Sequence, residues 1–353
     1  MKRNQNIEML RGVAILMILF YHYTISVPGM VKGSFGLILD ESICQVAMCL
    51  FFSISGFGTY IYLDKQTENV TAWEYLKKRF RRIARQYYFC IGVILLTTGA
   101  SYLAWNQSFK ILSVLTFCQN LFYSTNGAIN GVSWTVALMM QFYVVAVPLY
   151  KLVKKYGIKS YVVSAILVLF IRIVISYYIL LHSLDSLNYV IYSIRQIFTT
   201  ADIFIAGMFA AKIYKSGKLK LSSRNGWAAT IGSGIGAILT FVIFTYTPQA
   251  IYVWGSNLRC WLWQPLVGLE TAVMLLCACS IQCKYRTLIG KIIQFVARNE
   301  YGIYLWHMIL FRNLSQQSPM YAGMLSRSPI LLLSLMIVLA IIVGAISNSL
   351  IRG

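Results

Sequence analysis

Charged residues are scarce in this chain. They make up 12% of its 353 residues, whereas hydrophobic residues make up 58%, and the mean hydropathy is +0.67. Ordinary soluble domains contain about 25% charged residues, and a soluble domain this apolar would expose large hydrophobic patches to water. The composition therefore excludes a soluble enzyme, a disordered protein and a nucleic-acid-binding protein. It indicates a protein that crosses a membrane several times.

The cysteine spacings of metal sites and redox motifs are also missing. None of the eight cysteines belongs to a CxxC pair, and all lie in or near apolar segments. We expect them to pack as small hydrophobic side chains, because free cysteine is among the residues most often buried. No loop is long enough for a soluble domain. Residues 1–353 are therefore expected to form a single membrane-embedded domain without a bound metal.

The chain does contain a series of apolar segments near the ~20 residues that a helix needs to cross ~30 Å of hydrocarbon. They are residues 10–29, 43–63, 84–104, 131–150, 160–181, 190–211, 226–247, 259–283, 300–316 and 328–351. With a cytoplasmic N-terminus, ten such spans place most of the 31 lysines and arginines in the cytoplasm, as the positive-inside rule requires. We expect an all-α polytopic membrane helix bundle of about ten transmembrane helices with both termini cytoplasmic. The shorter stretch 110–123 is interpreted as an interfacial or re-entrant helix.

Two ionisable residues of the first segment are candidates for chemistry, because such residues are costly inside a membrane. Arg11 and His22 are eleven residues apart, so a helix places them within ~20° of one face and ~16 Å apart along its axis. Arg11 then marks the cytoplasmic mouth, and His22 lies near mid-membrane. A neutral imidazole there is suited to act as a general base. A structural histidine bonded to a neighbouring hydroxyl is an equally good explanation of this pair alone.

Basic and polar residues recur in later segments. Six of the nine residues from Lys77 to Arg85 are basic. This pattern favours a cytoplasmic loop beside anionic lipids, although arginine side chains also suit a phosphate clamp for a cytosolic nucleotide cofactor. Glu300 and His307 are seven residues apart and share a helix face, where they could tie helices together.

Taken together, these segments resemble the acyltransferase 3 family of bacterial integral-membrane acyltransferases, over nearly the whole chain. Each motif is weak singly, but their order and the matching spans make the resemblance specific. The stretches that carry it are Arg11 to His22 (RX10H), Phe51–Phe57 (FFxxSGF), Arg79–Ile83 (RFxRI), Ser133–Tyr143 (SW…QFY) and Tyr301–His307 (similar to YxLYLWH).

The resemblance implies an enzyme of the cytoplasmic membrane that transfers an acyl group, commonly acetyl, from cytosolic acyl-CoA. The implied acceptor is a hydroxyl of a surface or lipid-linked glycan, such as O-antigen, capsule or exopolysaccharide. By the same resemblance, His22 is the catalytic histidine and Arg11 its partner. The residues implied to hold the CoA phosphates are Arg79, Arg82, Arg81 and Lys78. Those implied to support the substrates are Ser55, Trp134, Tyr143, Tyr304 and His307.

The chain departs from the family pattern at several positions. Many members carry acidic residues where this chain has Met139 and Met140, so a carboxylate role would have to move, for example to Asp202 or Glu270. A common proline after RFxRI is Arg85 here. We expect the stand-alone form of the family, without the esterase-like C-terminal domain that some members carry.

Two chemical routes and one rival class stay open at this point. A donor entering from the basic mouth would reach His22 with an extended pantetheine arm. His22 would then deprotonate the acceptor hydroxyl or form an acetyl-histidine intermediate. The rival is a transporter or flippase for a glycan or lipid-linked precursor, which would typically show inverted halves. Its pathway would be lined by Arg172, Arg195, Asp202 and Glu270. The aromatic segment 252–263 suits either sugar stacking or an interface belt.

Overall fold

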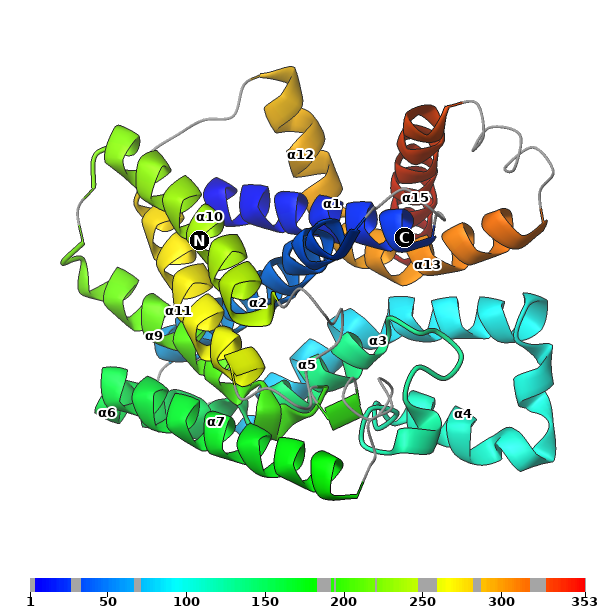
Figure 1. Cartoon of the computed structure of the whole chain (residues 1–353), viewed down its shortest axis with the longest axis horizontal. Coiled ribbons are helices and arrows are strands. Elements are labelled where there is room, and N and C mark those ends of the chain that lie inside the picture. Colours follow the sequence, from blue (N-terminus) through cyan, green and yellow to red (C-terminus); the bar gives the residue numbers. More distant parts are fainter. Residues whose placement is uncertain are drawn as a thin grey trace.

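A computed structural model describes residues 4–26, 33–66, 71–182, 192–193, 195–219, 221–246, 259–281, 287–317 and 328–352. Within these residues the regular elements are all helices, which confirms the predicted all-α class. The helices are α1 (Gln5–Ser26), α2 (Gly33–Lys65), α3 (Ala72–Thr97), α4 (Ser108–Leu115), α5 (Trp134–Val144), α6 (Ala146–Tyr156), α7 (Ile158–Leu181), α9 (Ala201–Ser216), α10 (Ser223–Thr245), α11 (Arg259–Ser280), α12 (Leu288–Arg298), α13 (Glu300–Gln317) and α15 (Pro329–Arg352) (Figure 1). Most of the predicted sugar-stacking segment 252–263 lies outside the described residues.

Six of the described helices are long and apolar enough to cross a membrane, namely α1, α2, α7, α10, α11 and α15. The pair α5 and α6 counts as a seventh span if it is taken as one helix bent by 63°. The protein is therefore a multi-pass membrane protein. The count of about ten spans and the cytoplasmic position of both termini stay predictions.

Several helix boundaries differ from the expected spans. The basic cluster was expected in a loop, but it forms the first turns of α3, because Thr71 and Glu74 make a capping box that starts the helix there. The expected span 190–211 is shorter, since α9 begins only at Ala201 after a 3₁₀ turn. The short helix expected within 110–123 exists as α4. Helix α12 was not anticipated, and its exposed apolar face is typical of an interfacial helix.

Glycines bring α2 and α9 into backbone contact beside the future site. A Cβ added at Gly56 would lie 2.0 Å from the carbonyl oxygen of Phe204, and one at Gly207 would lie 2.0 Å from that of Ser53. Membrane helices often use small residues in this way to approach closely. The contact turns one face of the FFxxSGF segment onto α9, while Phe51 and Ser55 face a cavity on another side.

Replacing Gly56 with alanine is expected to lower the thermal stability of the purified protein. Overpacking of this kind costs about 1–3 kcal/mol, which exceeds the ~1 kcal/mol that alanine gains over glycine within a helix. Gly58→Ala is the matched control, because a Cβ there meets nothing within 4 Å. The melting temperature in detergent, followed by tryptophan fluorescence, should fall only for Gly56→Ala. Equal melting temperatures for the two variants would contradict the close contact between α2 and α9.

Candidate active site

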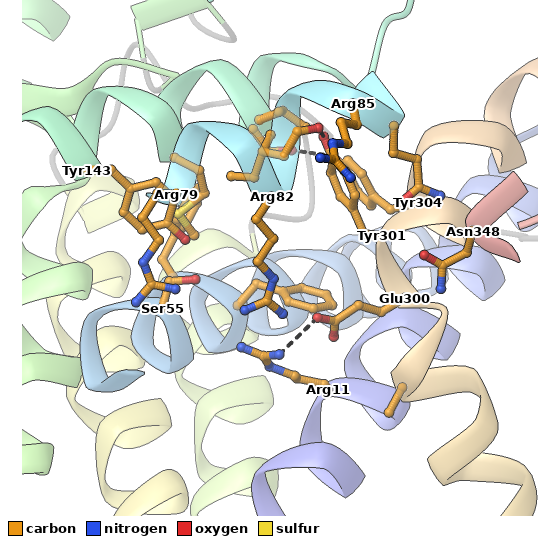
Figure 2. A pocket seen from close by; sticks show the side chains of 18 of the residues that line it. Arg11, Ser55, Arg79, Arg82, Arg85, Tyr143, Glu300, Tyr301, Tyr304 and Asn348 are labelled. Atoms are coloured by element: carbon orange, nitrogen blue, oxygen red, sulfur yellow. Dashed lines mark hydrogen bonds and ion pairs between the residues drawn. The ribbon is translucent and has the colours of Figure 1, made fainter. Parts of the chain in front are cut away.

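A cavity of about 410 Å³ opens between α1, α2, α3, α5 and the α12–α13 junction (Figure 2). We call it the arginine recess, because the described residues that line it include six arginines and one carboxylate, that of Glu300. The six are Arg11, Arg79, Arg81, Arg82, Arg85 and Arg298. This excess of positive charge attracts anions, and guanidinium groups match the oxygen geometry of phosphates.

An ion pair in the recess joins α1, near the start of the chain, to α13, near its end. Arg11 Nη1 on α1 lies 3.1 Å from Glu300 Oε1 on α13, and both side chains are mostly buried (Figure 2). Glu300 stands in the first turn of α13, where the helix dipole favours a negative charge. The buried Nε of Arg11 has no hydrogen-bond partner. Sequence reasoning predicted Arg11 at the cytoplasmic mouth, which stays a prediction, and did not identify Glu300 as its partner.

Arg79 is held in place by tyrosines instead of a carboxylate. Its Nε donates a hydrogen bond to the hydroxyl of Tyr75 at 3.1 Å, and its guanidinium lies 5.1 to 5.7 Å from the ring centroids of Tyr62, Tyr75 and Tyr143. Such cation–π contacts orient the guanidinium without neutralising it. Arg79 is thus positioned for a ligand while its positive charge stays available.

Arg82 points from α3 toward Arg11 across the recess (Figure 2). Desolvation in the recess, and then the positive charge of Arg11, lower the pKa of Arg82. Among the described residues, neither Arg79 nor Arg82 forms an ion pair with a carboxylate. A bound phosphate would relieve the repulsion between these like charges.

The deep end of the recess leads to a pair of histidines. Ile18 and Tyr304 line the recess, and their backbone oxygens contact the two imidazoles. His22 Nδ1 lies 3.1 Å from Ile18 O, His307 Nδ1 lies 2.7 Å from Tyr304 O, and His307 Nε2 lies 3.2 Å from His22 Nδ1. His307 is fully buried, whereas His22 keeps some accessible surface. The two helices α1 and α13 are therefore joined twice, by Arg11–Glu300 at the mouth and by this pair inside.

The hydrogen-bond partners assign the tautomers of the two neutral rings. A backbone carbonyl only accepts, so His307 Nδ1 carries the proton that is donated to Tyr304 O. His307 Nε2 is then an acceptor, and His22 Nδ1–H donates to it and to Ile18 O. The ring lone pair of His22 consequently lies on Nε2. That nitrogen is the one suited to accept a proton.

The structure gathers most of the residues expected at the site. Seven of them line the arginine recess, namely Arg11, Ser55, Arg79, Arg81, Arg82, Tyr143 and Tyr304. His22 and His307 do not line it, but they contact the backbone oxygens of its lining residues Ile18 and Tyr304. Two expected residues lie elsewhere. Lys78 is exposed and donates to the hydroxyl of Tyr62 at 3.4 Å. Trp134 is buried and does not line the recess. The guanidinium of Arg195 lies over its ring, 4.6 Å from the ring centroid.

Several lining residues were not named as site residues, although three of them, Arg85, Glu300 and Tyr301, lie in stretches that the sequence analysis singled out. The others are Gln86, Arg298 and Asn348. Arg85 and Gln86 follow Arg82 by three and four residues, so the helical spacing was a usable signal for both of them. Asn348 carried no comparable signal, because it reaches the recess only through the packing of α15 against α13.

The carboxylate of the recess is not one of those proposed to replace the family acids. Asp202 is fully buried and accepts from Gln264 at 3.1 Å, while Glu270 accepts from Thr240 at 2.9 Å. Neither lines the recess, whereas Met139 does. Met140 is buried and faces a separate cavity between α3 and α5. Glu300 is therefore the acidic group that the recess contains.

The family comparison covers the same residues. Residues 4–348 match the sequence model of the acyltransferase 3 family, which is described as an acyltransferase domain. The chain belongs to the acyltransferase 3 family. A search of curated proteins and a search of solved structures each found no match. Membership supports acyl transfer as the activity and a membrane as its setting, and it confirms the resemblance drawn from the motifs.

Replacing His307 with alanine is expected to slow acyl transfer by about 10- to 100-fold, because His22 Nδ1–H loses an acceptor and its tautomer is less strictly set. His307→Gln should recover part of the rate, since its amide oxygen can accept from His22. His182→Ala, at the exposed end of α7, is the control. Rates would be measured with radiolabelled acyl-CoA at equal protein amounts. A fully active His307→Ala, or His307→Gln as slow as alanine, would contradict the assignment.

Proposed function

We propose that this chain transfers an acetyl group from cytosolic acetyl-CoA to a hydroxyl of a surface or lipid-linked glycan. The observation that carries the proposal is the arginine recess, which has an excess of positive charge and adjoins a histidine pair through its lining residues Ile18 and Tyr304. CoA carries phosphates at one end and a thioester at the other, joined by a long thin arm. Its phosphates match the arginines Arg79 and Arg82, which have no carboxylate partner among the described residues.

The dimensions of α1 support the same donor. Arg11 and His22 lie on one continuous helix, so their separation along its axis is ~16 Å. An extended pantetheine arm covers such a distance. With its phosphates at the mouth, the donor would bring its thioester past Ile18 and Tyr304 toward His22. The recess thus favours a ligand with separate anionic and reactive ends over a compact anion.

The chemistry follows from the lone pair on His22 Nε2. In direct transfer, Nε2 takes the proton of the acceptor hydroxyl while the hydroxyl oxygen bonds to the thioester carbonyl carbon. The carbon–sulfur bond then breaks, and the CoA thiolate takes the proton back from the imidazolium, which leaves neutral histidine, free CoA and the ester. In the alternative route, Nε2 itself attacks the thioester carbonyl carbon and the CoA thiolate leaves. The hydroxyl oxygen then attacks the carbonyl carbon of the acetyl-histidine, its proton passes to the CoA thiolate, and neutral histidine is released with the ester and free CoA. Arg11 and Glu300 hold α1 and α13 in the register that both routes require.

The transporter alternative receives no comparable support. None of its four candidate residues lines the arginine recess. Arg172 donates to Thr199 O at 3.0 Å in the buried interior, Glu270 pairs with Thr240, and Arg195 stacks on Trp134. Family membership and the arginine recess with its adjoining histidine pair both favour the enzyme.

Variants of the recess and of the histidine should separate donor binding from transfer. In a strain that lacks the gene, the wild-type chain is expected to restore the O-acetyl signals of the surface glycan in proton NMR spectra. His22→Ala should restore no signal but keep its affinity for CoA, because the histidine lies beyond the phosphate-binding arginines. Arg79→Gln should lose the signal together with about tenfold or more of the CoA affinity, since a charge-assisted contact is removed.

Lys155→Gln is the matched control, because Lys155 is exposed on α6 away from the recess. It should keep both the NMR signal and the CoA affinity measured by calorimetry on the purified protein. All variants would be compared at equal membrane levels. Full acetylation by His22→Ala, or undiminished CoA affinity in Arg79→Gln, would contradict the proposed chemistry.

A further inference from the structure

A second polar cluster lies beside His22, at the end of α1 that is distant from Arg11. Tyr21 on α1 donates its hydroxyl proton to Glu41 Oε2 on α2, and Gln45 Nε2 donates to Glu41 Oε1 at 2.7 Å. The arginine recess is lined by none of the residues of this cluster, namely Tyr21, Glu41, Gln45, Trp134 and Arg195. The cluster is therefore separate from the recess.

Arg195 completes this cluster with a positive charge. Its guanidinium lies 4.6 Å from the ring centroid of Trp134, and its Nη1 lies 3.5 Å from Asn126 Oδ1. Trp134 and Gln45, the latter a donor to Glu41, line one small cavity, so Arg195 and Glu41 belong to the same cluster. The cluster adjoins the imidazole, because the ring centroid of Tyr21 lies 5.1 Å from that of His22.

Glu41 and Arg195 have opposite charges, but they do not pair with each other. Among the described residues, neither forms an ion pair with any partner. Ionisable groups at membrane depth normally pair or face a polar cavity, since burial of a lone charge is unfavourable. A neighbouring but unjoined carboxylate and guanidinium are consistent with a ligand that lies between them.

The accessibility of His22 points to the same side. His22, Tyr21, Glu41 and Arg195 all keep part of their surface accessible, although they stand among buried residues of α1, α2 and α5. His22 is not among the residues that line the arginine recess. On the side of the cluster, its ring contacts that of Tyr21, which is hydrogen-bonded to Glu41. A molecule reaching it there does not need to pass through the recess.

We infer that Glu41 and Arg195 form the binding site of the acceptor, a neutral polyhydroxylated sugar, on the side of His22 opposite the arginine recess. The inference rests on the proposed function and extends it. The carboxylate of Glu41 accepts hydrogen bonds from sugar hydroxyls, and the guanidinium of Arg195 donates to sugar oxygens. Because the two charges cancel, the site suits a neutral sugar better than a strongly anionic one. Donor and acceptor then approach the same imidazole from opposite directions.

The test measures the two substrates separately. The probe is the unacetylated surface glycan isolated from the deletion strain, used with radiolabelled acetyl-CoA and the purified full chain. Glu41→Gln and Arg195→Gln are each expected to raise the KM for the glycan about tenfold or more, because a charge-assisted hydrogen bond is lost. The KM for acetyl-CoA should change less than about twofold, since its phosphates bind elsewhere.

Glu270→Gln is the matched control, because Glu270 is also a carboxylate of an apolar helix held by a hydroxyl, that of Thr240. It should leave both KM values unchanged. If a glutamine variant does not reach the membrane, Arg195→Lys keeps the charge and is expected to raise only the KM for the glycan.

An unchanged KM for the glycan, or a parallel rise in the KM for acetyl-CoA, would overturn the acceptor site while leaving the donor recess intact. A wild-type chain that acetylates no glycan would overturn the proposed function, and this inference with it.

Discussion

Positive charge is unfavourable at membrane depth, and the arginine recess contains more of it than its single glutamate can neutralise. The surrounding structure makes this tolerable. Tyrosine rings hold Arg79, the Arg11–Glu300 pair joins α1 to α13, and the recess stays open to an anionic ligand. The fold thus leaves an arginine-lined recess open between these helices, which is the proposed mouth for the phosphates of the donor.

Acyl transfer between a polar donor and a polar acceptor requires that they meet where water is excluded. In the proposed mechanism the histidine pair is such a place, because His307 is buried and His22 contacts Tyr21 of the second cluster. His307 fixes one nitrogen of His22, which leaves the other for the proposed proton transfer. The two charged clusters would position the substrates, while the imidazole moves the proton. The single imidazole of His22 is enough when both the donor and the acceptor are brought to it.

The sequence predicted what depends on local periodicity. The spacing of Arg11 and His22 gave their common face, and the helix α1 indeed contains both. Motif resemblance supplied Arg79, Arg82, Ser55 and others that the structure gathers in one recess. Contacts between distant segments could not be predicted this way. The Arg11–Glu300 pair joins opposite ends of the chain, and Trp134 at the start of α5 lies against Arg195, about sixty residues further along the chain.

The most direct test of the account is a cryo-electron microscopy structure of the full chain in lipid nanodiscs with CoA bound. The account predicts phosphate density against Arg79 and Arg82, and an extended arm that ends past Ile18 and Tyr304 with its sulfur directed at His22. No ligand density is expected near Glu41 and Arg195, because CoA does not bind there in this account. CoA bound elsewhere, or bound in the recess with its sulfur directed away from His22, would contradict the central claim.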